Sequence, residues 1–137
     1  MVDLERLRLP RYAPLLAASR LGPDVTPAAV ALPPVPSEDR GLAVGFLRVF
    51  TDAFGLGDLP THAVVRDFVK PLTECHRCRL VDLGEVRPFT GRAATFASHA
   101  WGGRWGDLVA ALSDGNPPNW AVWIGACPTR WNLTHIW

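Results

Sequence analysis

The sequence has little of what marks a membrane-bound or nucleic-acid-binding protein. None of its apolar runs approaches the roughly 20 residues that a helix needs to cross a bilayer. Neither sign of charge is in excess, since 14 Lys and Arg face 13 Asp and Glu, and Lys70 is the single lysine. Residues 1–6 also lack the basic and apolar regions of a signal peptide. We therefore expect an intracellular, cytoplasmic protein that binds neither nucleic acid nor membrane.

Cysteine is also scarce, with three in the chain, and reduced thiols are the default in an intracellular protein. Two of them form the motif Cys75-His76-Arg77-Cys78. A structural zinc site needs four nitrogen or sulfur ligands, usually as two pairs, and no second CxxC is present. A redox CxxC would lie between a strand and the start of a helix, whereas this motif follows a predicted helix. Cys75, His76 and Cys78 are therefore weak metal candidates, and we expect free thiols, no metal and no cofactor.

What the chain does contain is typical of a globular protein, with 48% hydrophobic and 20% charged residues. Residues 1–60 are predicted to form a helical lead-in, with broken helices over 2–21 and a proline-rich linker at 22–36. The PxxP pattern from Pro33 to Pro36 resembles ligands of SH3-type domains, but a plain linker is the favoured interpretation. Residues 61–137 are predicted to form an α/β unit.

Two helices and a short strand are predicted between the linker and the central unit. The first helix begins with Ser37 as its N-cap and is ended by Gly55. Its apolar stripe, interpreted as core, consists of Leu42, Phe46, Phe50 and Phe54. The second helix begins at Thr61 and is bent or ended by Pro71. Residues 79–83 are predicted to form a short strand.

The central unit reads as strand, turn, helix and strand. Residues 93–98 are small, β-branched or aromatic, which favours a buried strand, and Gly102-Gly103 allow a sharp turn. A helix over about 104–114 follows from apolar residues at i, i+3, i+4 and i+7: Trp105, Leu108, Val109 and Leu112. A second strand is predicted at about 120–124. This order is the βαβ signature, so the fold class is α/β, a helical N-terminal half followed by a partial parallel sheet of two to three strands.

The end of the first strand is the candidate ligand site. In open α/β sheets, ligands bind beyond the carboxyl ends of the strands, and a helix N-terminus attracts anions. Ser98, His99, Trp101 and Arg104 occupy that position, so a nucleotide is a possible ligand. The turn carries neither a P-loop nor a GxGxxG pattern.

Ser98, His99 and Asp107 have the residue types of a hydrolase triad. Adjacent strand residues point to opposite faces, so Ser98 and His99 cannot easily bond each other, and no G-x-S-x-G elbow is present. We therefore assign no catalytic residue.

Five segments together resemble a family of uncharacterised algal and protist proteins that carry a "SHAW" motif. The segments are KPLT at 70–73, CRLVDL at 78–83, ATFASHAW at 94–101, DLVAAL at 107–112 and VWI at 122–124. In the order of their elements, these proteins resemble Toll/interleukin-receptor (TIR-like) domains. The resemblance spans roughly residues 61–124 and implies a flavodoxin-like sheet of which only part is present.

The resemblance also implies a function. In NAD-cleaving TIR domains the catalytic glutamate lies well beyond the second strand, and no glutamate follows Glu85 here. After Ile124 the family pattern continues with an acidic residue and an aromatic, whereas this chain continues Gly125-Ala126-Cys127. We therefore expect a truncated or altered C-terminus, a poorly ordered final stretch, and a non-catalytic module for protein interaction or signalling.

Three interpretations remain at this point. The first is a protein-interaction module that binds a protein partner or self-associates, because an incomplete sheet leaves an apolar edge. The second is an NAD-like nucleotide binder or hydrolase that uses the turn at 98–104. The third is a non-functional gene fragment.

Overall fold

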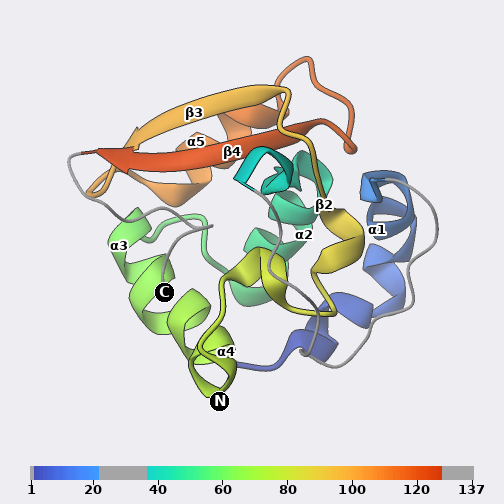
Figure 1. The fold of residues 1–137 in the computed structure, drawn as a ribbon, viewed down its shortest axis with the longest axis horizontal. Helices are drawn as coiled ribbons and strands as arrows, with labels where there is room; N and C mark the ends of the chain where they lie inside the picture. The colour runs from blue at the N-terminus through green and yellow to red at the C-terminus, as the bar shows by residue number, and fades with distance from the viewer. Residues whose placement is uncertain (1, 22–36, 128–137) are drawn as a thin grey trace.

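The computed structural model describes residues 2–21 and 37–127, with side chains up to Ile124. Its centre is a four-stranded mixed sheet in the order β2-β1-β4-β3 (Figure 1). The strands are β1 (Gly41–Ala43), β2 (Thr90–Gly91), β3 (Thr95–Ala100) and β4 (Ala121–Cys127). The fold is α/β, as the sequence predicts.

The predicted βαβ unit is present. β3 and β4 are parallel, in a register that runs from Thr95 opposite Val122 to Ala100 opposite Cys127. Helix α5 (Trp105–Ser113) connects them, with Asp107 in its first turn, where a carboxylate suits the helix dipole. Each of the three elements lies within about three residues of its predicted place, because strand and helix periodicities are unambiguous there.

The prediction of two to three parallel strands is wrong, because β1 and β2 complete a mixed sheet of four. β1 is antiparallel to both neighbours, with Leu42 opposite Thr90 of β2 and opposite Val122 of β4. The helix expected from Ser37 starts later. Residues Ser37–Asp39 form a 3₁₀ turn, β1 follows, and helix α2 (Val44–Phe54) begins only after it. Gly55 ends α2 in the left-handed conformation, at φ 65°, as predicted.

The first segment is a run of broken helices, as predicted. It contains the 3₁₀ helices Leu4–Arg8 and Pro10–Tyr12 and helix α1 (Ala13–Ser19), with Pro14 in the first turn. The predicted linker at 22–36 lies outside the described residues, as do residues 128–137 of the expected altered C-terminus.

A second helical run begins at Thr61, also as predicted. It comprises α3 (Thr61–Val64), a π-helical turn (Val65–Val69), α4 (Lys70–Thr73) and a 3₁₀ turn (Glu74–His76). The π turn ends two residues before Pro71, whose missing amide disrupts regular helical bonding. Pro71 therefore changes the helix type without ending the run.

The prediction of a strand at residues 79–83 is wrong. Leu80–Asp82 form a 3₁₀ helix, and a second one at Arg87–Phe89 leads into β2. The apolar residues Leu80, Val81 and Leu83 are buried all the same. A short apolar run satisfies burial in either conformation, so its pattern does not distinguish a strand from a tight turn.

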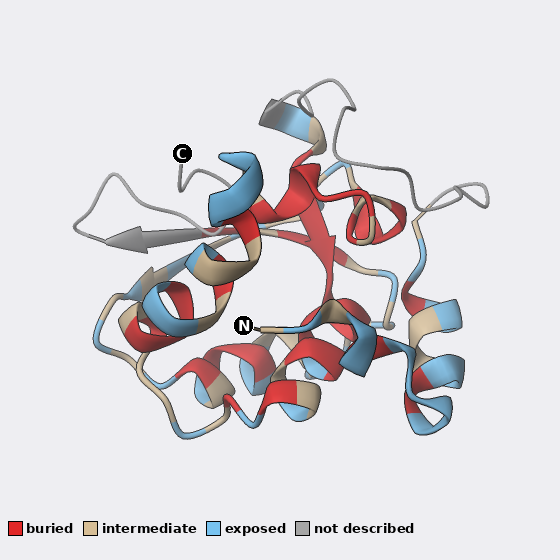
Figure 2. Cartoon of the chain, turned by 90° about the horizontal axis from the view of Figure 1, so that it is seen from below, coloured by how far each residue is buried: buried red, intermediate tan, exposed pale blue. Residues whose placement is uncertain are grey.

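One hydrophobic core joins all of these elements. Helices α2 and α5 pack side by side beneath the sheet, and buried residues gather where the helices meet it (Figure 2). The stripe from α2 lies at the centre, with Phe46 stacked on both Phe50 and Phe89. Segments on both sides of residue 60 therefore contribute to one core and one sheet. No helix within 2–21 or 37–127 is long and apolar enough to cross a membrane.

Candidate functional site

Strand β3 divides its residues between two faces. Thr95, Ala97 and His99 are half-buried on the helix-covered side, where Thr95 accepts a 2.9 Å hydrogen bond from the Trp120 indole. The outer face carries Phe96, Ser98 and Ala100, all exposed. Ser98 and His99 therefore point apart, as the alternation of strand residues requires.

His99 packs against the glycine turn. A Cβ atom at Gly103 would come within 2.8 Å of His99 Cε1, so only glycine allows the ring to lie there. The Nε2 atom is buried and has no hydrogen-bond partner among the described residues. His99 thus holds the turn by packing, and its Nε2 does not open toward solvent.

The turn at 101–106 is hydrogen-bonded to the first residues of α3 and to the loop before it. The amide of Thr61 donates to the Gly103 carbonyl at 2.9 Å, and the amide of His62 donates to the Trp101 carbonyl at 3.0 Å. In the other direction, the amides of Trp105 and Gly106 donate to carbonyls of Leu59 and Gly57, at 2.9 and 3.0 Å. These two amides belong to the first turn of α5, so protein carbonyls already occupy donors that an anion would need.

Arg104 and Trp101, the other predicted site residues of this turn, also contact other parts of the protein. Arg104 pairs with the carboxylate of Asp58, and both side chains are largely exposed. An exposed pair of this kind contributes at most about 1 kcal/mol. Trp101 is half-buried and packs against the core. The structure therefore brings His99, Trp101 and Arg104 to one turn, leaves Ser98 on the outer face, and forms no common cavity from the four among the described pockets.

The outer face is the surface that motif analysis missed. Phe96 is 65% exposed and stacks on Trp123 of β4, with ring centroids 4.4 Å apart and planes 20° apart. Leu9, at 43%, is the other large hydrophobic residue found exposed within the described ranges. The buried strand predicted over residues 93–98 is wrong in this respect, because every residue of β3 is half-buried or exposed. Alternation separates Phe96 from Ala97 but does not say which of the two faces the core covers. The stacking partner depends on the β3–β4 register, which local sequence does not give.

β3 is also an edge strand. It pairs with β4 on one side, and no described strand pairs with its other side (Figure 1). Natural edges are usually protected by charged side chains, proline or a bulge. The six residues Thr95–Ala100 contain no proline, Lys, Arg, Asp or Glu. Within the described residues, the edge therefore leaves backbone groups without a strand partner, beside the exposed Phe96 and the half-buried Trp123.

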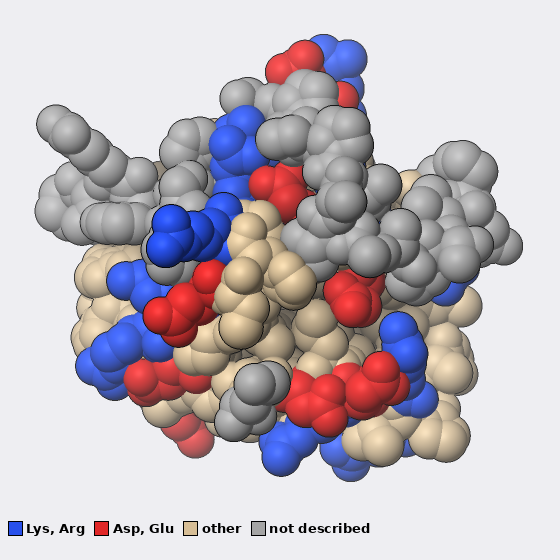
Figure 3. Space-filling model, turned by 60° about the horizontal axis from the view of Figure 1, so that its bottom comes forward, with Lys and Arg blue, Asp and Glu red and all other residues tan. Residues whose placement is uncertain are grey.

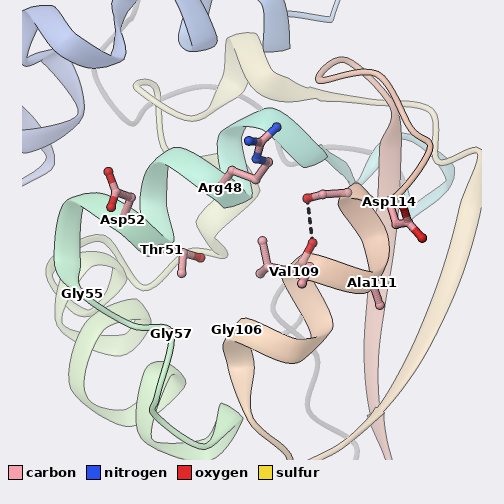
Figure 4. A pocket seen from close by; sticks show the side chains of 11 residues that line it. Arg48, Thr51, Asp52, Gly55, Gly57, Gly106, Val109, Ala111 and Asp114 are labelled. Atoms are coloured by element: carbon pink, nitrogen blue, oxygen red, sulfur yellow. Dashed lines mark hydrogen bonds between the residues drawn. The ribbon is translucent and has the colours of Figure 1, made fainter.

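A groove lies between α2 and α5. This groove encloses about 820 Å³, with Arg48, Thr51 and Asp52 on the α2 side and Asp114 beyond α5 (Figure 4). Thr51 accepts a 2.8 Å hydrogen bond from the buried Trp105 indole, which joins the two helices. Small residues, among them Gly57 and Gly106, also line it. Thr51 serves helix packing, and the charged side chains Arg48, Asp52 and Asp114 lie apart around the groove (Figure 4).

The CxxC motif supplied the weak metal candidates Cys75, His76 and Cys78. No group of three or more potential metal ligands occurs in the described part of the chain. Cys75 is exposed and Cys78 is half-buried, both as free thiols. Burial raises the pKa of Cys78, and the negative charge of Asp82 adds to this effect. Cys78 is therefore a poor nucleophile at neutral pH.

Charges of both signs are interspersed on the face drawn in Figure 3, so no patch of one sign dominates it. Among the described residues, these features define an α/β protein with an exposed Phe96 on one sheet face and no strand paired to the outer side of β3. Comparison with protein-family models, curated proteins and solved structures gave no match in any of the three.

Proposed function

We propose that this chain is a non-catalytic protein-interaction module that self-associates through the outer face and free edge of β3. The observation that carries the proposal is Phe96, exposed and stacked on Trp123 at an edge without charge or proline. Removing such a ring from water is favourable by about 1.5–3 kcal/mol. The proposal includes the intracellular setting expected from the sequence.

A second copy fits this edge because two identical strands can pair antiparallel about a two-fold axis. With Ser98 of each copy opposite the other, Phe96 lies opposite Ala100 and all three residues share the outer face. The two sheets then become continuous, and the backbone groups of both edges find partners. This register therefore pairs the edge backbone groups of both copies and places their apolar outer faces side by side.

Sedimentation across a range of protein concentrations tests the proposal. The wild type is expected to shift from monomer to dimer as concentration rises. The variant Phe96→Ser is expected to raise the dimer Kd about tenfold or more, since each 1.4 kcal/mol lost is tenfold in affinity. Leu9→Ser is the matched control, because it removes an exposed hydrophobic residue away from the sheet. A wild type that stays monomeric, or equal effects of both variants, would overturn the proposal.

The relationship to TIR-like domains is part of the same proposal. It is supported by the parallel β3–α5–β4 unit, which has the predicted order and lies within the resembling segment. A TIR-like module of this kind would act in signalling by self-association.

The rival is an NAD-binding enzyme that uses the turn at 98–104. Because the amides of Trp105 and Gly106 already donate to loop carbonyls, we expect no saturable binding of NAD. Isothermal titration of the wild type and of His99→Ala checks this. Binding that His99→Ala weakens would favour the rival over the interaction module.

A further inference from the structure

A small apolar cavity lies between the first helical segment and the 3₁₀ helix Arg87–Phe89 that leads into β2. It encloses about 110 Å³. Its apolar walls come from both sides and consist of Leu4, Leu7, Leu16, Pro88 and Phe89. The cavity is more closed to solvent than the groove between α2 and α5. It belongs neither to the turn at 98–104 nor to the outer face of β3.

The fold holds the walls of this cavity in place. Leu7 and Phe89 are both buried members of the core. The Phe89 ring stacks on Phe46 of α2, with ring centroids 5.2 Å apart. The amide of Leu21 donates to the Pro88 carbonyl at 3.0 Å, which joins the first segment to the 3₁₀ helix. Because these walls are already positioned, little ordering opposes the entry of a ligand.

The charged residues that also line the cavity do not bury a charge in it. Arg8 pairs with Glu5 at 2.9 Å, and both side chains are more than half exposed. Arg20 is exposed and Glu85 is half-buried. None of the lining residues has a buried side-chain nitrogen or oxygen without a hydrogen-bond partner among the described residues. The lining side chains therefore offer a charged ligand no buried partner.

We infer that this cavity binds a small neutral apolar molecule, up to the size of a benzene ring. A cavity of about 150 Å³ lined by Leu, Ile and Phe stays dry and takes up benzene or xenon, and this one is of the same order. A charged ligand would lose its hydration there without a compensating partner. An aromatic ligand gains further from an edge-to-face or offset contact with Phe89. The volume excludes a helix or strand of another protein, so the ligand is a free small molecule.

Binding at this position joins two distant parts of the chain. The 3₁₀ helix Leu4–Arg8 and helix α1 form one side of the cavity, and the 3₁₀ helix before β2 forms the other. The ligand therefore stabilises the folded state by mass action, because the unfolded chain does not bring these walls together.

Thermal unfolding of the full chain with dissolved benzene tests the inference. At about ten times its Kd, benzene is expected to raise the Tm of the wild type by about 3–5 °C. Benzoate and benzylammonium, at the same concentration, carry the same ring with a negative or a positive charge and are expected to give no shift. A shift with either charged probe as large as that with benzene would overturn the assignment of a neutral ligand.

Two matched variants locate the binding site. Leu16→Phe places a larger side chain at the cavity and is expected to lose the benzene-dependent shift. Leu9→Phe makes the same change at an exposed residue that does not line the cavity, and it is expected to keep the shift. If Leu16→Phe does not fold, nuclear Overhauser contacts between benzene and the methyl groups of Leu7 in the wild type are expected instead. A wild type whose Tm does not rise with benzene would overturn the inference, as would an equal rise in folded Leu16→Phe or the absence of those contacts.

Discussion

Two thiols three positions apart meet different surroundings. Cys75 is exposed at the end of the second helical run, whereas Cys78 is half-buried beside the charge of Asp82. Burial and that negative charge both disfavour the thiolate, so the pKa of Cys78 is raised. The motif is symmetric in sequence, and only the folded environment makes its two members unequal.

Alkylation with iodoacetamide, followed by peptide mass spectrometry, should show this inequality. Because a raised pKa means less thiolate at neutral pH, Cys75 is expected to react faster, with Cys78 gaining rate as pH rises. Peptide mapping separates both residues from Cys127. The denatured protein is the control, in which the two rates should converge. Equal rates in the native protein at neutral pH would contradict the assignment.

The candidate site shows what residue-level sequence reasoning can reach. The alternation of side chains along β3 predicts that Ser98 and His99 point to opposite faces, and the structure confirms this. The pairing of Arg104 with Asp58 and the capture of the α5 amides by Leu59 and Gly57 could not be predicted. Both depend on a loop far away in the sequence, which no local pattern relates to the turn.

At the scale of elements, the predicted pieces are those with a strong local period. β3, α5 and β4 satisfy that condition, and so does the phenylalanine face of α2. β1 does not, because three residues are too few for a period, and Leu42 fits a helical stripe equally well. Its conformation is set by pairing with β2 and β4. Long-range pairing thus overrides the helix start expected at Ser37.

The contact between α5 and the preceding loop gives a test at this scale. A Cβ atom at Gly106 would lie 2.5 Å from the Gly57 carbonyl oxygen, so Gly106→Ala must displace backbone. Alanine favours a helix by about 1 kcal/mol over glycine, but overpacking costs about 1–3 kcal/mol. We expect net destabilisation in urea unfolding.

Gly102→Ala is the matched control, because an added Cβ there meets no atom within 4 Å. It should leave the free energy of unfolding nearly unchanged. Stabilisation by Gly106→Ala would show that the loop yields at little cost.

At the scale of the whole molecule, the N-terminal half is part of the sheet. β1 lies between β2 and β4, and α2 supplies much of the shared core. The sequence suggested a lead-in followed by an α/β unit from residue 61. A unit of that extent would lack the strand that joins β2 to β4.

Truncation tests that division. We expect a fragment of residues 61–137 to show no cooperative thermal transition by circular dichroism, because it exposes one edge of β4 and loses α2. The full chain should unfold in one cooperative step, which would also argue against a non-functional fragment. A cooperative melt of 61–137 alone would establish the division at residue 60.

The place of β1 also bears on how the protein is made. β1 follows Arg40 closely, yet its partner β4 lies near the end of the described chain. During synthesis the phenylalanine face of α2 can meet Phe68 and Phe89 first, but its packing against α5 and the pairing of β1 with β4 wait until those elements leave the ribosome. Apolar segments in that condition aggregate readily and are typical clients of chaperones. Because of this topology, the chain is most exposed to aggregation during its synthesis, before the fold is complete.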